Sequence, residues 1–176
     1  METIFILSSI LLSIAISLGV GSSTIAVTNF FMAIADGTIE PTERRMMGVT
    51  YWVLRAAMVL IALMLIMQYM LGYAGVETPY FASTHAIAMG ALTVVLYVNA
   101  VAMTYRLMPS TFGPAIQASS WYTLGVTAAL VPLGITSFSL VVFFLAYIAT
   151  FALFLSLING IMGWLRHREL EQNVQS

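Results

Sequence analysis

The chain has 176 residues, of which 61% are hydrophobic and only 7% are charged, whereas a soluble domain is about 25% charged. Six basic and seven acidic residues are too few to cover the surface of a water-soluble protein of this length, so the composition indicates that lipid is the main solvent. The net charge of -1 and the absence of lysine argue against a nucleic-acid-binding surface and exclude a lysine Schiff base, and the absence of cysteine excludes disulfides and thiolate metal sites.

The first predicted element is an apolar helix over about residues 4–35. At 1.5 Å per residue it would be roughly 48 Å long, which exceeds a hydrocarbon core of about 30 Å. It must therefore tilt, kink or protrude, and Gly19 and Gly21 are the expected place for a kink. The run lacks a positively charged start and is much longer than a signal peptide, so we expect it to be retained.

A charged loop over residues 36–45 follows, and four further apolar runs complete the chain. The expected transmembrane helices cover about residues 4–35, 46–73, 80–108, 115–133 and 138–165, with a short charged tail at 166–176. The predicted fold class is therefore all-α, a polytopic transmembrane bundle of five spans that forms one domain over residues 1–176.

The arginines predict the orientation of these spans, because positive residues of short loops are retained on the cytoplasmic side. All arginines outside the spans fall in the first loop, at the third connection or after the last span: Arg44, Arg45, Arg106, Arg166 and Arg168. We therefore expect an outside amino terminus and a cytoplasmic carboxyl terminus, as five spans require, in a multi-pass protein of the plasma (inner) membrane.

Each predicted span has one amide or arginine side chain within about ten residues of its cytoplasmic end: Asn29, Arg55, Asn99, Gln117 and Asn159. Polar groups inside a membrane are costly, so each indicates a candidate site. If they point inward, Asn29, Arg55, Asn99 and Asn159 form a ligand-binding vestibule open to the cytoplasm, in which the charge of Arg55 suits an anion or a carboxylate. The alternative interpretation is that they cap helix ends, extend to the interface or bond neighbouring helices, with Arg55 paired to Asp36 or Glu40.

A row of small residues follows one face of the first helix at spacings of three and four: Ser9, Ser13, Ser17, Gly21, Thr24 and Thr28. Such a row predicts close packing against another helix. A hydroxyl-lined permeation path is the second interpretation, and the two are compatible.

In the third span, His85 shares a face with Asn99 and Arg106, which raises the hypothesis of a proton route. Leu92 interrupts that line, so His85 is also interpreted as an interfacial residue. A haem held by two histidines is disfavoured because His167, the other histidine, lies at the opposite membrane face.

No metal site or cofactor is expected. Met64, Met67 and Met70 recur at a spacing of three, which suits copper(I), but adaptable apolar packing explains them better. The segment 36–40 resembles the start of a calcium loop, yet the later ligand positions do not fit. Catalytic motifs are also absent from the sequence, so an enzyme is not expected.

The leading functional prediction is a small transporter or channel with a polar vestibule facing the cytoplasm. The alternative is a non-catalytic accessory or assembly subunit of a larger membrane complex, which would dock through the charged first loop and tail. In either case the expected partners are the lipid bilayer and either further copies of the chain or a membrane complex. Nucleic acid is not expected as a partner.

Overall fold

A computed structural model describes residues 1–35, 40–109 and 111–175, and this part of the chain contains helices and no strand. In chain order the elements are α1 (Glu2–Ala35), α2 (Pro41–Tyr73), α3 (Thr84–Thr104), α4 (Phe112–Ala129), a short 3₁₀ helix η1 (Val131–Leu133) and α5 (Leu140–Gln175). The all-helical fold class is therefore confirmed.

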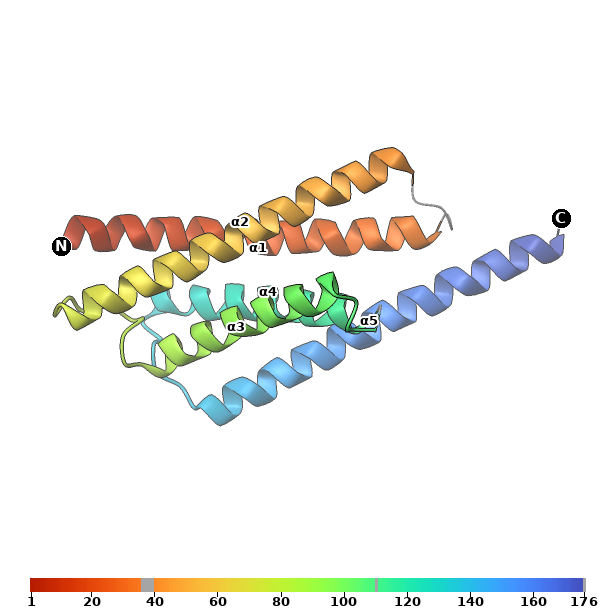
Figure 1. Cartoon of the computed structure of the whole chain (residues 1–176). Helices are drawn as coiled ribbons and strands as arrows, with labels where there is room; N and C mark the ends of the chain where they lie inside the picture. Colours follow the sequence, from red (N-terminus) through yellow and green to blue (C-terminus); the bar gives the residue numbers. More distant parts are fainter. Residues whose placement is uncertain (36–39, 110, 176) are drawn as a thin grey trace.

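The long helices run alternately in opposite directions, so the two termini lie at opposite ends of the bundle (Figure 1). The start of α2 and the end of α3 lie at the same end, which carries Arg44, Arg45 and Arg106 and is called the arginine end below (Figure 1). The most extensive contacts between helices are those of α1 with α2 and those of α4 with α1, α3 and α5. Helix α4 is therefore the central helix of the bundle.

Some helix boundaries differ from the predicted spans. Helix α3 begins later than expected because Ser83 caps it, with its hydroxyl accepting a hydrogen bond from the backbone N–H of Ala86 at 3.0 Å. The fourth span is divided, since α4 ends at Ala129 and η1 follows. Helix α5 continues to Gln175, where a short tail was expected.

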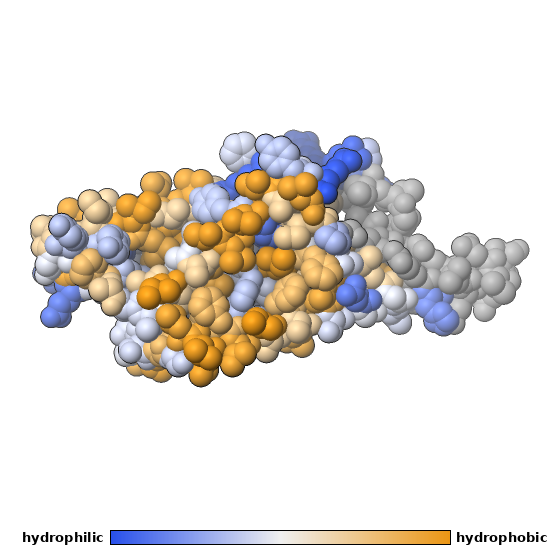
Figure 2. Space-filling view, turned by 60° about the horizontal axis from the view of Figure 1, so that its bottom comes forward, coloured by the Kyte–Doolittle hydropathy of each residue, from blue (hydrophilic) through white to orange (hydrophobic). Residues whose placement is uncertain are grey.

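Four helical segments of the described chain are long and apolar enough to cross a membrane: Glu2–Met32, Arg44–Tyr73, Thr84–Thr104 and Leu140–Leu165. Their outward side chains are apolar, as Leu145 and Ile148 of α5 illustrate with exposed fractions of 61% and 58%. Figure 2 shows apolar side chains over the middle of one face, with most strongly hydrophilic residues toward its margins. These features are those of a multi-pass membrane protein.

Helix α4 is not apolar enough to be recognised as a membrane span from its composition, and its position in the bundle explains why. It packs extensively against α1, α3 and α5, and Ser119, Ser120 and Thr127 on it are buried. A helix surrounded by protein contacts little lipid, so it needs fewer apolar side chains than its neighbours.

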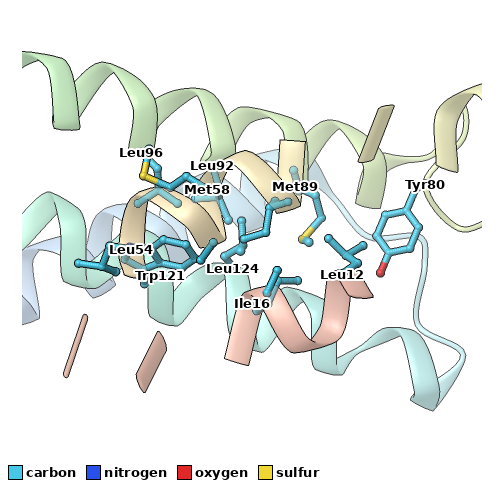
Figure 3. Packing of buried hydrophobic residues seen from close by; sticks show 14 of the residues in the cluster. Leu12, Ile16, Leu54, Met58, Tyr80, Met89, Leu92, Leu96, Trp121 and Leu124 are labelled. Carbon is cyan, nitrogen blue, oxygen red and sulfur yellow. The ribbon is translucent and has the colours of Figure 1, made fainter. Parts of the chain in front are cut away.

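Buried apolar side chains from all five helices form the core (Figure 3). Trp121 of α4 is its largest fully buried member, and it packs against α1 at Gly19. A Cβ atom at Gly19 would overlap the six-membered ring of Trp121, so only glycine lets the ring approach the helix this closely. Helix α1 is continuous from Glu2 to Ala35. The role of Gly19 in this helix is to leave room for the ring of Trp121.

Part of the row of small residues on α1 faces outward in the single chain, although Ser9 and Thr24 of the row make hydrogen bonds to Gln68 of α2 and Tyr122 of α4. Leu12, Ile16 and Gly19 are buried, whereas Ser13, Ser17 and Gly21 of the predicted face are exposed. Large apolar side chains and the approach of Trp121 determine which face turns inward. The hydroxyls of Ser13 and Thr28 donate to carbonyls of their own helix, as Ser13 Oγ does to the carbonyl of Ser9 at 2.9 Å.

Candidate functional site

A cavity of about 220 Å³ lies near the arginine end, between α2, α3 and α4. Its wall comprises Tyr51, Leu54, Arg55 and Met58 of α2, Ala100, Met103 and Thr104 of α3, and Gln117 of α4. The residues from α2 recur at spacings of three and four and therefore share one helix face, as do those from α3. Helices α2 and α3 diverge toward this end, which leaves the space that the cavity occupies (Figure 1).

Asn99 of α3 lies next to this cavity and orients Gln117. Its side chain is 2% exposed, and its Nδ2 group donates to the carbonyl of Gly113 at 3.0 Å and to Gln117 Oε1 at 3.1 Å. A backbone carbonyl only accepts hydrogen bonds, so this network determines the orientation of both amides. Because Oε1 of Gln117 accepts the hydrogen bond from Asn99, the Nε2 group of Gln117 is available as a donor.

Gly113 makes this network possible, because α3 and α4 approach closely there. A Cβ atom at Gly113 would lie 2.8 Å from Cγ of Met103, so the Met103 side chain or the helices would have to shift. The approach brings the carbonyl of Gly113 within reach of Asn99, so the position of Gln117 depends on this contact.

Arg55 supplies the positive charge of the cavity wall. The wall contains no carboxylate, and no described residue makes a hydrogen bond or ion pair with Arg55. The side chain is exposed, so its guanidinium group is accessible from the cavity and from outside the bundle. A guanidinium group beside an amide donor can bind a carboxylate or a phosphate through charge-assisted hydrogen bonds.

The predicted vestibule residues separate into two groups. Arg55 lines this cavity, and Asn99 lies beside it, where it donates a hydrogen bond to the wall residue Gln117. Asn29 of α1 is half-buried and does not line this cavity, and Asn159 of α5 is exposed. The expected pairing partner Asp36 lies outside the described residues.

His85 lies far from this cavity, at the opposite end of α3. It is fully buried between the rings of Tyr80 and Phe138, whose centroids are 5.2 and 6.2 Å from its own. Neither ring nitrogen has a hydrogen-bond partner among the described residues. Leu92 in the apolar core separates it from Asn99, so the hypothetical proton line is not continuous along α3.

Gln68 of α2 is a buried polar residue that the sequence interpretation missed. Its Nε2 group donates to the hydroxyls of Ser8 and Ser9 on α1, both at 2.8 Å. Those hydroxyls donate in turn to the carbonyl of Phe5. A lone amide inside the apolar run 46–73 was the available signal, and its role here is to join two helices.

In the described part of the chain no group of three or more histidine, cysteine, aspartate or glutamate residues could hold a metal ion. The nitrogen donors on the cavity wall belong to the guanidinium group of Arg55 and the side-chain amide of Gln117. Comparisons with protein-family models, with curated proteins and with solved structures found no match.

Proposed function

We propose that this protein is a small membrane transporter that binds an anionic group, a carboxylate or a phosphate, in the cavity at its arginine end. The observation that carries the proposal is that Arg55 and the donor-oriented amide of Gln117 line one cavity whose wall contains no acidic residue. The charge of a guanidinium group at the edge of the hydrocarbon core needs compensation by water or by an anion. A bound anion would provide that compensation.

The proposal includes five spans, with α4 as the central one. The alternating directions of the helices and the opposite ends of the two termini support this topology (Figure 1). The arginine end would face the cytoplasm of a plasma membrane, since positive residues are retained there. The cavity would then take its ligand from the cytoplasmic side.

A carrier fits better than an open channel through one chain. Beyond the cavity, Leu54 and Met58 belong both to its wall and to the apolar core, which also contains Leu92. This core lies between the cavity and the opposite end of the described bundle. Transport would therefore require the helices to rearrange, with α2 moving most easily against α3, where its contacts are sparse.

The test is ligand-dependent stability of the full-length protein purified in a neutral detergent. Succinate or inorganic phosphate should raise the midpoint of thermal unfolding, because a ligand that binds only the folded state stabilises it. Arg55→Met should abolish the rise, while Arg44→Met removes an exposed arginine of the same end outside the cavity wall and should preserve it. If Arg55→Met and Arg44→Met reduced the ligand-dependent rise equally, general electrostatic attraction would explain the binding, and a specific site at Arg55 would be contradicted.

An accessory subunit is the second candidate, and one observation favours it. The carboxyl-terminal part of α5 extends past the ends of the other helices (Figure 1), and Asn159 on that helix is exposed. An amide that faces lipid favours a partner helix that can bond it. Native mass spectrometry of the protein extracted from its own membrane distinguishes the two, since an accessory subunit should retain a different protein in fixed proportion.

A further inference from the structure

A second hollow continues from the anion cavity toward the outside of the bundle. It has a volume of about 400 Å³, lies between α2 and α3, and shares Arg55, Met58, Ala100 and Thr104 with the cavity. Because four wall residues are common to both, the two spaces adjoin each other along these residues. We call this second part the lateral groove.

The lateral groove is apolar and open to the surroundings of the bundle. Val59 of α2 and Val101 of α3 line it and are 50% and 53% exposed. The exposure of these two valines places the opening of the groove on the outer surface between α2 and α3. In a membrane, such a sideways opening meets lipid chains.

The depth of Arg55 matches that of lipid head groups. Helix α3 has 21 residues and is therefore about 31 Å long, close to the thickness of the hydrocarbon core. Its last residue, Thr104, would lie at the edge of that core, and Thr104 and Ala100 share a wall with Arg55. A long arginine side chain at this level reaches the interface, where the charged groups of lipids lie.

We infer that the groove binds an amphiphilic anion, an acyl chain that bears a carboxylate or a phosphate, which enters sideways from the lipid. The anionic group meets Arg55 and the Nε2 group of Gln117, and the chain lies along the lateral groove against Val59 and Val101. This inference rests on the proposed function for the anion cavity and specifies its substrate class. A small anion from water would need the cavity alone, and the apolar groove would add nothing to its affinity.

The experiment measures binding to the full-length protein in nanodiscs of phosphatidylcholine, by thermal unfolding and by native mass spectrometry. The probes are oleate, acetate, inorganic phosphate and oleyl alcohol. Oleate should raise the unfolding midpoint and be retained at one molecule per chain, at concentrations where the other three have no effect. Oleyl alcohol controls for the chain without charge, and acetate and phosphate control for charge without the chain.

Two substitutions and a control locate the site. Arg55→Gln and Val59→Trp should each weaken oleate binding at least tenfold, the first by removing the charge and the second by filling the groove from an exposed position. Arg44→Gln removes an exposed arginine from the same end and should leave binding unchanged. The unfolding midpoint of each variant without ligand checks that it folds, and Val59 is exposed enough to accept the larger ring.

The outcomes separate this inference from the proposed function. If acetate or phosphate stabilises the protein as strongly as oleate and Val59→Trp has no effect, the lateral groove is not part of the site, while the anion cavity stands. If none of the anions binds, both proposals fail. Equal binding of oleate and oleyl alcohol would show an apolar groove without anion recognition and would also overturn the inference.

Discussion

The packing of Trp121 against α1 predicts opposite effects for two glycines on the same helix. A Cβ atom at Gly19 would overlap the Trp121 ring, whereas one at Gly21 would meet nothing within 4 Å. Neither the buried indole, with an exposed fraction of 0%, nor the backbone of α1 can move without disturbing the core. Gly19→Ala is therefore an overpacking change, and Gly21→Ala is its matched control.

The magnitude follows from two opposing contributions. Overpacking a core typically costs about 1 to 3 kcal/mol, and replacing glycine by alanine inside a helix gains about 1 kcal/mol. Gly19→Ala should therefore destabilise the protein by up to about 2 kcal/mol, and Gly21→Ala should be neutral or stabilising by up to about 1 kcal/mol. Only the first variant has a steric cost in the single chain.

The assay is reversible unfolding in mixed micelles of a neutral detergent and dodecyl sulfate, followed by Trp fluorescence or circular dichroism. Equal stability of Gly19→Ala and Gly21→Ala would refute the packing of Trp121 against Gly19. Gly21→Leu adds a test of the small-residue face: a loss of stability or of assembly in that variant would show that this exposed face packs against another helix in an oligomer.

Three further predictions concern the buried polar residues and the topology. Asn99→Leu leaves the carbonyl of Gly113 and Gln117 Oε1 without their hydrogen-bond donor. Chemical unfolding should show a loss of stability of about 1 to 3 kcal/mol, and ligand titration should show weaker anion binding although Arg55 is intact. His85→Leu replaces a buried ring whose nitrogens have no partner, so the unfolding midpoint should stay equal or rise, and a clear fall would indicate that the imidazole has a partner. Single cysteines at Thr42 and Glu77 should be labelled by an impermeant reagent from opposite sides of the membrane, and labelling from one side would contradict the topology.

The helices were predictable because each apolar run is long and bounded by charged or turn residues. The existence of α4 was also predictable from its position between two turns, although its composition alone does not mark a span. Its central place was not, because burial among three helices is a property of packing. The continuation of α5 to Gln175 was missed since a charged segment after a span is equally compatible with a tail.

The sequence predicted how far along each helix the polar residues lie, but not toward which side of the helix their side chains point. Arg55, Asn99 and Asn159 were all expected near the arginine end, yet Arg55 lines the cavity, Asn99 lies beside it, and Asn159 is exposed on α5. The contact of Asn99 with Gln117 depends on how α3 and α4 are rotated and on the close approach at Gly113, neither of which a single sequence specifies. The small residues of α1 show the same limit of sequence-based prediction. Their spacing of three and four predicts that they share a helix face, but it does not predict which helix, or lipid, that face contacts.

The central claim is that an anion binds between Arg55 and Gln117, and anomalous diffraction from crystals soaked with 4-bromobenzoate, a carboxylate whose bromine is not displaced by protein side chains, tests it most directly. The claim predicts a bromine peak in the cavity beside the guanidinium group of Arg55, and its loss in crystals of Arg55→Met. Bromine peaks confined to Arg44, Arg45 or other exposed cations, with none in the cavity of the unsubstituted protein, would contradict it.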